Sequence, residues 1–225
     1  MPVHSTPVSI AVSDGARVSG LVQRPPGSRA CLLLAHGAGA GMRHPFMAAI
    51  ADDLAGLGIA TLRYQFPYME KLGKRPDPPD VCQATVRAAV AAAQELLPGL
   101  SLFAGGKSFG GRMTSQAQAV SPLSGVRGLA FVGFPLHPPQ RPSDARAEHL
   151  LRVDIPMLFL QGSRDAFAQL GLLRPLIERL GARARLVLIQ DADHSFHVPA
   201  RAGATDAELR AAMMGALAAW IESLL

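Results

Sequence analysis

Three polar residues have the types and the order along the chain that nucleophilic catalysis needs. Ser108 is the centre of a G-x-S-x-G pattern at residues 106–110, and Asp165 and His194 each follow an apolar run further along. A serine hydroxyl is a weak nucleophile unless a base takes its proton, and an imidazole oriented by a carboxylate is such a base. The sequence therefore predicts acyl transfer, with Ser108 as nucleophile, His194 as general base and Asp165 as the group that orients the imidazole.

The segments around Ser108 favour a nucleophile elbow. The apolar run Leu100–Ala104 predicts a strand, and the residues Arg112–Val120 predict a helix. A sharp turn between such elements exposes the central side chain and needs glycines beside it, because other backbone passes closely. The N-terminus of the following helix favours negative charge that develops there. The alternative is a flexible glycine turn with an incidental serine.

Other residues nearby offer alternatives for the same roles. Asp193 and Asp191 are candidates for the carboxylate, but Asp193 adjoins the histidine and adjacent side chains rarely face each other. His197 is an alternative base in the same loop as His194. Lys107 precedes the serine and suggests a Ser–Lys dyad, but adjacent side chains diverge. We expect Lys107 to be salt-bridged or solvated.

Acyl transfer also needs donors for the oxyanion. We expect one to be the backbone N–H of Phe109, the residue after the nucleophile. The other is expected in the glycine-rich loop HGAGAG at residues 36–41. We choose Ala38 there, with Gly37 and Gly39 as alternatives, because small residues let the backbone approach a substrate. A plain strand–helix connection is the alternative for this loop.

No pattern indicates a metal, a nucleotide or a nucleic acid. The glycine loop lacks the G-K-[ST] of phosphate loops and the G-x-G-x-x-G of dinucleotide sites, and its His36 is expected to be hydrogen-bonded beneath it. Cys31 and Cys82 form no zinc pattern and are expected to be buried. The formal charge of +5 is spread along the chain without a basic stripe. We predict no metal, no cofactor and no nucleic-acid partner.

The elements that must position these residues alternate between strands and helices. Such alternation predicts an α/β fold, with a mostly parallel twisted sheet of about seven to eight strands and helices on both faces. The expected strands are an N-terminal antiparallel hairpin of Val8–Val12 and Val18–Gln23 around Asp14-Gly15, then Ala30–Ala35, Ile59–Tyr64, Leu100–Ala104, Val126–Val132, Pro156–Gln161 and Arg185–Ile189. The expected helices are Pro45–Leu57, Asp80–Leu97, Arg112–Val120, a short one near Asp144–Leu151, Ala166–Leu180 and one from about Thr205, with loops at Gln65–Pro79 and Phe134–Ser143.

Length and composition fit one domain over residues 1–225. Hydrophobic residues make up 49% and charged residues 17%, which excludes disorder as the main state. The first residues have neither the basic nor the apolar region of a signal peptide, and no apolar run reaches the ~18 residues of a membrane span. We expect a cytoplasmic protein without a membrane partner.

The chain resembles the α/β-hydrolase superfamily over almost its whole length. The resemblance lies in LLLAHGAGAG (32–41), FAGGKSFGGRM (103–113), LFLQGSRD (158–165) and DHSF (193–196), and in the order Ser, Asp, His. More narrowly, residues 62–80 and the GKSFGGRM string are similar to a small branch without a cap. That branch is related to dienelactone hydrolase and to the hydrolase-like domain of a chromatin acetyltransferase complex subunit.

This resemblance implies an α/β-hydrolase fold without a large cap, and a serine hydrolase that cleaves an ester-type acyl bond of a small substrate. Dienelactone hydrolase proper uses a cysteine where this chain has Ser108, so its substrate does not transfer. A thioesterase or peptidase with the same triad, or a non-catalytic scaffold that binds a partner, are the alternatives. Arg63, Tyr64, Phe66 and His137 are candidates for the pocket wall, although packing is the expected role of each. The sequence predicts neither the natural substrate nor the oligomeric state.

Overall fold

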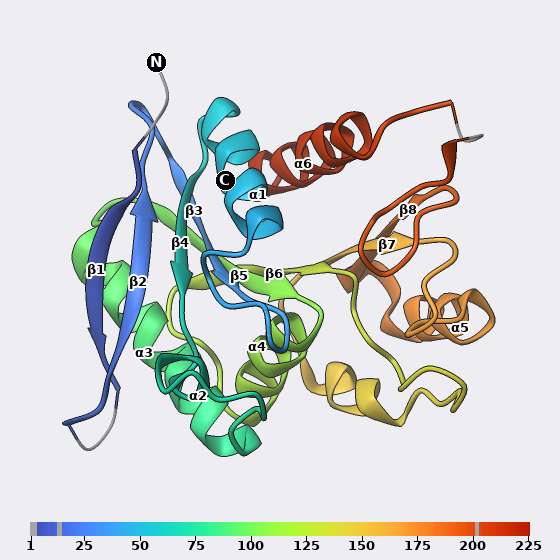
Figure 1. Cartoon of the computed structure of the whole chain (residues 1–225), viewed down its shortest axis with the longest axis horizontal. Helices are drawn as coiled ribbons and strands as arrows, with labels where there is room; N and C mark the ends of the chain where they lie inside the picture. The colour runs from blue at the N-terminus through green and yellow to red at the C-terminus, as the bar shows by residue number, and fades with distance from the viewer. Residues whose placement is uncertain (1–3, 13–14, 201–202) are drawn as a thin grey trace.

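One eight-stranded sheet crosses the centre of the molecule (Figure 1). The computed structural model describes residues 4–12, 15–200 and 203–225. The strands are β1 (Thr6–Ala11), β2 (Arg17–Gln23), β3 (Ala30–Ala35), β4 (Ala60–Tyr64), β5 (Ser101–Lys107), β6 (Val126–Val132), β7 (Met157–Gly162) and β8 (Ala184–Ile189). Their order in the sheet is β1-β2-β4-β3-β5-β6-β7-β8. The pairs β1–β2 and β2–β4 are antiparallel and all others are parallel, which confirms the predicted mostly parallel sheet with an N-terminal hairpin.

Helices cover both faces of this sheet, as predicted. In Figure 1, α1 and α6 lie above the sheet, and α3 and α4 lie below it. The α-helices are α1 (Pro45–Gly56), α2 (Pro67–Glu70), α3 (Pro79–Leu96), α4 (Phe109–Val120), α5 (Leu170–Leu180) and α6 (Asp206–Glu222), and two 3₁₀ segments are η2 (Ala145–Arg152) and η3 (Gly181–Arg183).

The central strand β3 shows why its sequence is apolar throughout. Successive strand residues point to opposite faces, and here both faces are covered. Cys31, Leu33 and Ala35 join the cluster beneath α3, α4 and α5. Leu32 and Leu34 join the other cluster, beneath α1 and α6. All six residues of β3 are buried. The continuous apolar run is therefore explained by a strand that has helices packed on both of its faces.

Several local features differ from the sequence prediction, among them the start of α4, which lies at Phe109 and not at Arg112. The first strand is Thr6–Ala11 rather than Val8–Val12, and the predicted turn residue Asp14 lies outside the described residues. The predicted loop Gln65–Pro79 contains the short helix α2. The helix expected from Ala166 begins four residues later, because the preceding residues fold around the carboxylate of Asp165.

The carboxyl ends of the parallel strands meet at one edge of the sheet. The glycine-rich loop follows β3, the predicted nucleophile follows β5, and the predicted carboxylate and base follow β7 and β8. Ligands bind at this edge in open α/β sheets. Between β6 and β7, residues 133–156 form a loop and η2, and no lid domain is inserted there. No helix in the described ranges is long and apolar enough to cross a membrane.

Candidate active site

Ser108 occupies a strained turn between β5 and α4. Its backbone has φ 49° and ψ −112°, which is rare for a residue with a side chain. The Ser108 N–H donates to the carbonyl of Val132 at 3.1 Å, and the Ser108 carbonyl accepts from Arg112 at 3.1 Å in the first turn of α4. Strain of this kind persists only where the surroundings fix it, and it is typical of functional sites.

The glycines on either side of Ser108 are required by close packing against β3. A Cβ at Gly106 would lie 2.3 Å from the carbonyl oxygen of Ala35, and one at Gly110 would lie 2.5 Å from the same oxygen. Real Cβ atoms do not approach backbone so closely, so any larger residue would displace the turn. The predicted nucleophile elbow is therefore present, with the reason for its G-x-S-x-G pattern.

The structure brings the three predicted residues into one hydrogen-bonded chain. The Ser108 Oγ lies 2.8 Å from His194 Nε2, and His194 Nδ1 lies 2.6 Å from Asp165 Oδ2. The Asp165 side chain has no exposed surface, whereas 19% of the His194 side chain is exposed. A base in contact with a hydroxyl and oriented by a buried carboxylate is the arrangement that activates a serine.

The carboxylate of Asp165 is held by two further groups. Its Oδ1 accepts from the backbone N–H of Phe167 at 2.7 Å, and its Oδ2 also accepts from the amide of Gln161 at 2.5 Å. The Gln161 amide oxygen accepts from the N–H of Phe134 at 2.9 Å, so its NH₂ group must face the carboxylate. This explains the late start of α5, since the residues after Asp165 first close around its side chain.

Sequence reasoning missed two of these neighbours. Gln161 is the one polar residue of β7, and a fully buried amide in an apolar strand needs a partner. That signal was present in the sequence. Phe167 packs its ring against the imidazole of His194, with 4.3 Å between ring centroids. Nothing in the sequence around Phe167 indicates this contact, because it depends on how the loops after β7 and β8 meet.

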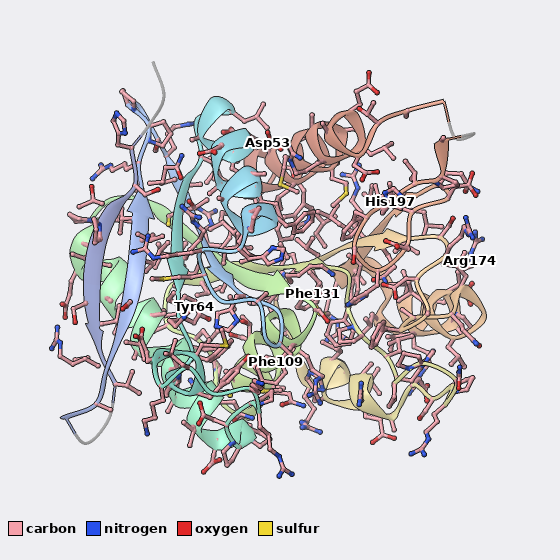
Figure 2. The ribbon with its side chains drawn as sticks, viewed as in Figure 1. Asp53, Tyr64, Phe109, Phe131, Arg174 and His197 are labelled. Carbon is pink, nitrogen blue, oxygen red and sulfur yellow. The ribbon has the colours of Figure 1, made fainter. Side chains whose placement is uncertain are left out.

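The alternative residues have other partners. The Asp193 carboxylate accepts from the backbone N–H groups of Ser195 at 2.8 Å and His197 at 3.0 Å, so it stabilises its own loop. His197 pairs with Asp206 at 2.8 Å, and this carboxylate raises the pKa of the exposed imidazole. In Figure 2, His197 lies above and to the right of Phe109, the residue that follows the serine.

Lys107 forms no ion pair with any described residue, so the predicted salt bridge is absent, and its side chain is partly buried at the cavity wall and not freely solvated. Its Nζ donates to the backbone carbonyl of His194 at 2.6 Å. Burial lowers the pKa of Lys107 to about 8. A Ser–Lys dyad is not formed, because the ammonium group is directed to the histidine loop instead of Ser108.

The backbone N–H groups predicted to bind an oxyanion, those of Ala38 and Phe109, have no hydrogen-bond partner among the described residues. The same holds for the N–H of the alternative Gly37. The N–H of Gly39 donates to the hydroxyl of Tyr68 at 3.0 Å, which occupies that alternative. His36 lies beneath the loop as predicted, with Nδ1 2.8 Å from the carbonyl of Gly37. Burial lowers the pKa of His36 and favours its neutral form.

A cavity of about 340 Å³ opens beside the Ser108 hydroxyl. Small residues of the glycine-rich loop form one side, and the start of α1 and the loops after β7 and β8 form the rest. Its lining comprises Gly37, Ala38, Ala40, His44, Phe46, Met47, Lys107, Ser108, Phe167, His194 and Ser195. Apolar and aromatic groups dominate, as in sites for small organic molecules.

The other predicted wall residues do not line this cavity. Arg63, Tyr64 and Phe66 are buried: the Arg63 guanidinium donates to Ser5 at 3.0 Å, and Phe66 packs edge-on against Phe109. His137 is also buried, with Nδ1 2.8 Å from the carbonyl of Pro138. These residues therefore pack in the interior or anchor loops, as expected.

A second buried serine–histidine pair lies away from the cavity. Ser115 Oγ is 2.7 Å from His149 Nε2 and joins α4 to η2. Ser115 lies inside a regular helix, and burial lowers the pKa of His149 to about 4. No carboxylate among the described residues pairs with His149. This pair therefore has the character of a packing contact.

The described residues contain no group of three or more metal-ligating side chains. Cys31 and Cys82 are free and buried, as expected, and burial raises the pKa of each thiol to about 12. Thiols of this kind are poor nucleophiles. Of the two serines that line the cavity, Ser108 is the one whose hydroxyl contacts a histidine, so it remains the nucleophile candidate.

Comparison with known proteins agrees with this architecture. Residues 28–222 match the family described as an alpha/beta hydrolase domain. Dienelactone hydrolase from Anabaena variabilis is 22% identical, with all of both chains covered and a TM-score of 0.81. A serine hydrolase without a lid from Xanthomonas campestris is also 22% identical, covering 98% of this chain and 96% of that one, with a TM-score of 0.74.

A cold-adapted esterase from an Arctic intertidal metagenomic library is 20% identical, covering 100% of this chain and 95% of that one, with a TM-score of 0.69. At these identities the similarity to each structure shows a shared fold. The similarity to the hydrolase-like domain of a chromatin acetyltransferase complex subunit is supported by none of these matches and stays a prediction.

Proposed function

The chain belongs to the family of alpha/beta hydrolase domains, and from this premise we propose that it is a serine hydrolase that cleaves ester bonds of small acyl substrates. The observation that carries the proposal is the hydrogen-bonded chain from Ser108 through His194 to Asp165, at a strained elbow beside an apolar cavity. The fold alone hosts many activities, so the site and not the fold supports this one.

In the proposed first step, the Ser108 Oγ attacks the acyl carbonyl carbon while His194 Nε2 takes the hydroxyl proton. The carbonyl π electrons move to oxygen and form the tetrahedral oxyanion. As this intermediate collapses, the bond to the leaving alcohol breaks, and His194 returns the proton to that alcohol. Water then attacks the acyl carbon of the acyl-enzyme while His194 takes its proton. The bond from that carbon to Ser108 Oγ breaks, the carboxylic acid leaves, and His194 returns the proton to Oγ.

Three sets of groups support these steps. Asp165 keeps the imidazole in the tautomer with a proton on Nδ1 and stabilises the imidazolium that forms. We assign the oxyanion to the N–H groups of Ala38 and Phe109, which have no partner within the described chain. The steps use protein side chains and water, so we propose activity without a metal or an organic cofactor.

The cavity supports a small acyl group as substrate. Its volume of about 340 Å³ is at the low end of the range for small-molecule sites. Phe46, Met47 and Phe167 provide apolar walls for the acyl part. We place the leaving alcohol toward solvent, because residues 133–156 supply no lid over the site.

Labelling with a fluorophosphonate probe tests the proposal. The probe phosphonylates an activated serine with loss of fluoride, so the wild-type protein is expected to be labelled and Ser108→Ala is expected not to be. Ser115→Ala is the matched control, and we expect it to be labelled at the wild-type rate because Ser115 lies outside the cavity. A folded wild-type protein that is not labelled would contradict the proposal and favour a scaffold.

A panel of p-nitrophenyl esters, acyl-CoA thioesters and aminoacyl amides then defines the acyl bond. We expect turnover of short esters to exceed that of the thioesters and amides. If the thioesters or the amides are turned over faster than the esters, the triad would still be the catalytic group. The protein would then be a thioesterase or a peptidase and not an esterase.

A further inference from the structure

Lys107 is the one charged group of the cavity wall that the proposed chemistry does not use. It comes directly before the nucleophile, at the end of β5. Its Nζ donates to the backbone carbonyl of His194 at 2.6 Å, which joins residues 87 positions apart in the sequence. The segment that carries Ser108 and the loop that carries His194 are therefore joined by a second bond, from the Lys107 side chain to the His194 backbone.

The loop that Lys107 holds contains strained backbone. Asp191 and Phe196 both have positive φ, at 59° and 63°, although neither is glycine. The far side of the loop is tied to the segment after β7, where the N–H of Arg164 donates to Ala192 at 2.9 Å. Strained segments keep their conformation only when their surroundings hold them.

The ammonium group of Lys107 lies in a space bounded by Gly133, the imidazole of His194 and the ring of Phe196. A Cβ at Gly133 would lie 3.0 Å from Lys107 Nζ and 3.5 Å from the imidazole of His194, so the glycine leaves room for both. The Nζ also lies 5.3 Å from the centre of the buried Phe196 ring, within the range of a cation–π contact.

Resting on the proposed function, we propose that Lys107 is a positioning residue, whose ammonium group holds the His194 backbone so that the imidazole stays on Ser108. It does not contact the reacting atoms. A charged donor makes a stronger hydrogen bond than a neutral one, so the hold depends on the protonated lysine.

Because the hold on His194 requires a protonated Lys107, we expect activity to have an upper pH limit. Burial lowers the pKa of Lys107 to about 8, while Asp165 and Asp193 act in the opposite direction. Those carboxylates and His194 are the ionisable groups that face Lys107 from the loops after β7 and β8. The loops after β3 and β6 approach it with Gly37 and Gly133, which carry no charge. Above about pH 8 the ammonium group loses its charge, and the fraction of correctly placed His194 is expected to fall.

The test measures the rate of fluorophosphonate labelling and the kcat and KM for p-nitrophenyl acetate between pH 6 and pH 10. We expect Lys107→Met to lose roughly 10- to 100-fold in labelling rate and kcat at pH 7, since small misplacements cost that much. KM should change little. Wild type should lose activity above about pH 8, and Lys107→Met should lack that decline.

Lys107→Arg is the conservative variant. Its guanidinium stays charged over this range, so it should recover part of the activity at pH 7 and keep it above pH 8. Lys74→Met removes an exposed lysine and should match wild type throughout. Circular dichroism at each pH shows the folded fraction to which rates are normalised.

Several results would overturn the inference. A Lys107→Met protein that is less stable but labels at the wild-type rate when folded would give Lys107 a merely structural role. A raised KM with unchanged kcat would make it a substrate-binding group. Faster labelling would mean that repulsion between ammonium and imidazolium outweighs the hold on the loop. Failure of the wild type itself to label would instead reject the proposed function.

Discussion

At the scale of single residues, the carboxylate of the candidate triad is held by a side chain that does not line the cavity. Gln161 is fixed at both ends, since its oxygen accepts from Phe134 and its NH₂ donates to Asp165. Its orientation is therefore determined by its partners. A buried carboxylate that accepts three hydrogen bonds cannot rotate away from the imidazole.

Gln161→Glu tests this role because it keeps the shape and changes the donor to an acceptor. The new carboxyl would lie against the carboxylate of Asp165, and two such groups in contact cannot both be ionised without a large cost. When the two carboxyl groups share one proton, a hydrogen bond between them can replace the one that the Gln161 amide donated. When pH rises and that proton leaves, the two carboxylates repel each other.

We therefore expect the kcat of Gln161→Glu, relative to wild type, to fall steeply as pH rises from 5 to 9. Gln161→Leu removes both the donor and the charge, and its loss of roughly 10-fold should not vary with pH. Initial rates with p-nitrophenyl acetate across this range measure both variants. A constant ratio near one for Gln161→Glu would show that Asp165 does not need this neighbour.

At the scale of elements, the sequence predicted the strands better than the starts of the helices. β3 and β7 are covered on both faces, so their residues are apolar almost without interruption and the strands are visible in the sequence. The start of α5 was misplaced because the side chain of Asp165 binds the N–H of Phe167, a contact set by tertiary structure. The short helix α2 has one turn, too little for a periodic pattern.

In the candidate site too, features set by local sequence could be predicted, and features set by tertiary contacts could not. Ser108, Asp165 and His194 could be chosen as candidates from the sequence because each follows a strand and carries a reactive group. The roles of Lys107 and Gln161 could not be read in full, because their partners come from other strands and depend on the order of the sheet.

The elbow itself gives a prediction at this scale. Gly110→Ala places a Cβ 2.5 Å from the carbonyl oxygen of Ala35, so β3 and α4 must separate. We expect a loss of roughly 2–3 kcal/mol or more in the free energy of unfolding, together with loss of fluorophosphonate labelling.

Gly215→Ala is the matched control, since Gly215 lies within α6 and a Cβ there meets no atom within 4 Å. Alanine is the better helix former, so this variant should gain roughly 0.5–1 kcal/mol and label normally. Urea unfolding measures both variants. Equal stability of the two proteins would mean that close packing against β3 does not require a glycine at position 110.

At the scale of the whole molecule, the order of the strands decides which loops form the site. β3 and β5 are neighbours at the centre, with β6, β7 and β8 following on one side. The glycine-rich loop, the elbow, the carboxylate and the base follow these strands and are thereby brought to one edge of the sheet. Alternation of elements predicts a parallel sheet, but the order depends on long-range packing that no local pattern encodes.

Below the sheet, the His149 pair has a consequence for stability and not for catalysis. Burial is the largest cause that lowers its pKa to about 4, followed by repulsion from Arg152 and Arg112. In the unfolded chain an imidazole titrates near its ordinary value of about 6.5. Between these two pH values His149 is protonated in the unfolded state and neutral in the folded state. The free energy of unfolding therefore falls as pH decreases from about 6.5 to about 4.

The full difference corresponds to roughly 2–4 kcal/mol of unfolding free energy, which is a large part of a typical domain's stability. His149→Gln can bond to Ser115 and cannot be protonated, so its stability should decrease less over this window than that of wild type. Urea unfolding at pH 7 and pH 4.5 measures the difference. Because His149 lies outside the cavity, the variant should be labelled by fluorophosphonate at the wild-type rate at pH 7. Parallel pH dependences for the two proteins would place the acid sensitivity elsewhere, and lost labelling would assign this pair to the active site.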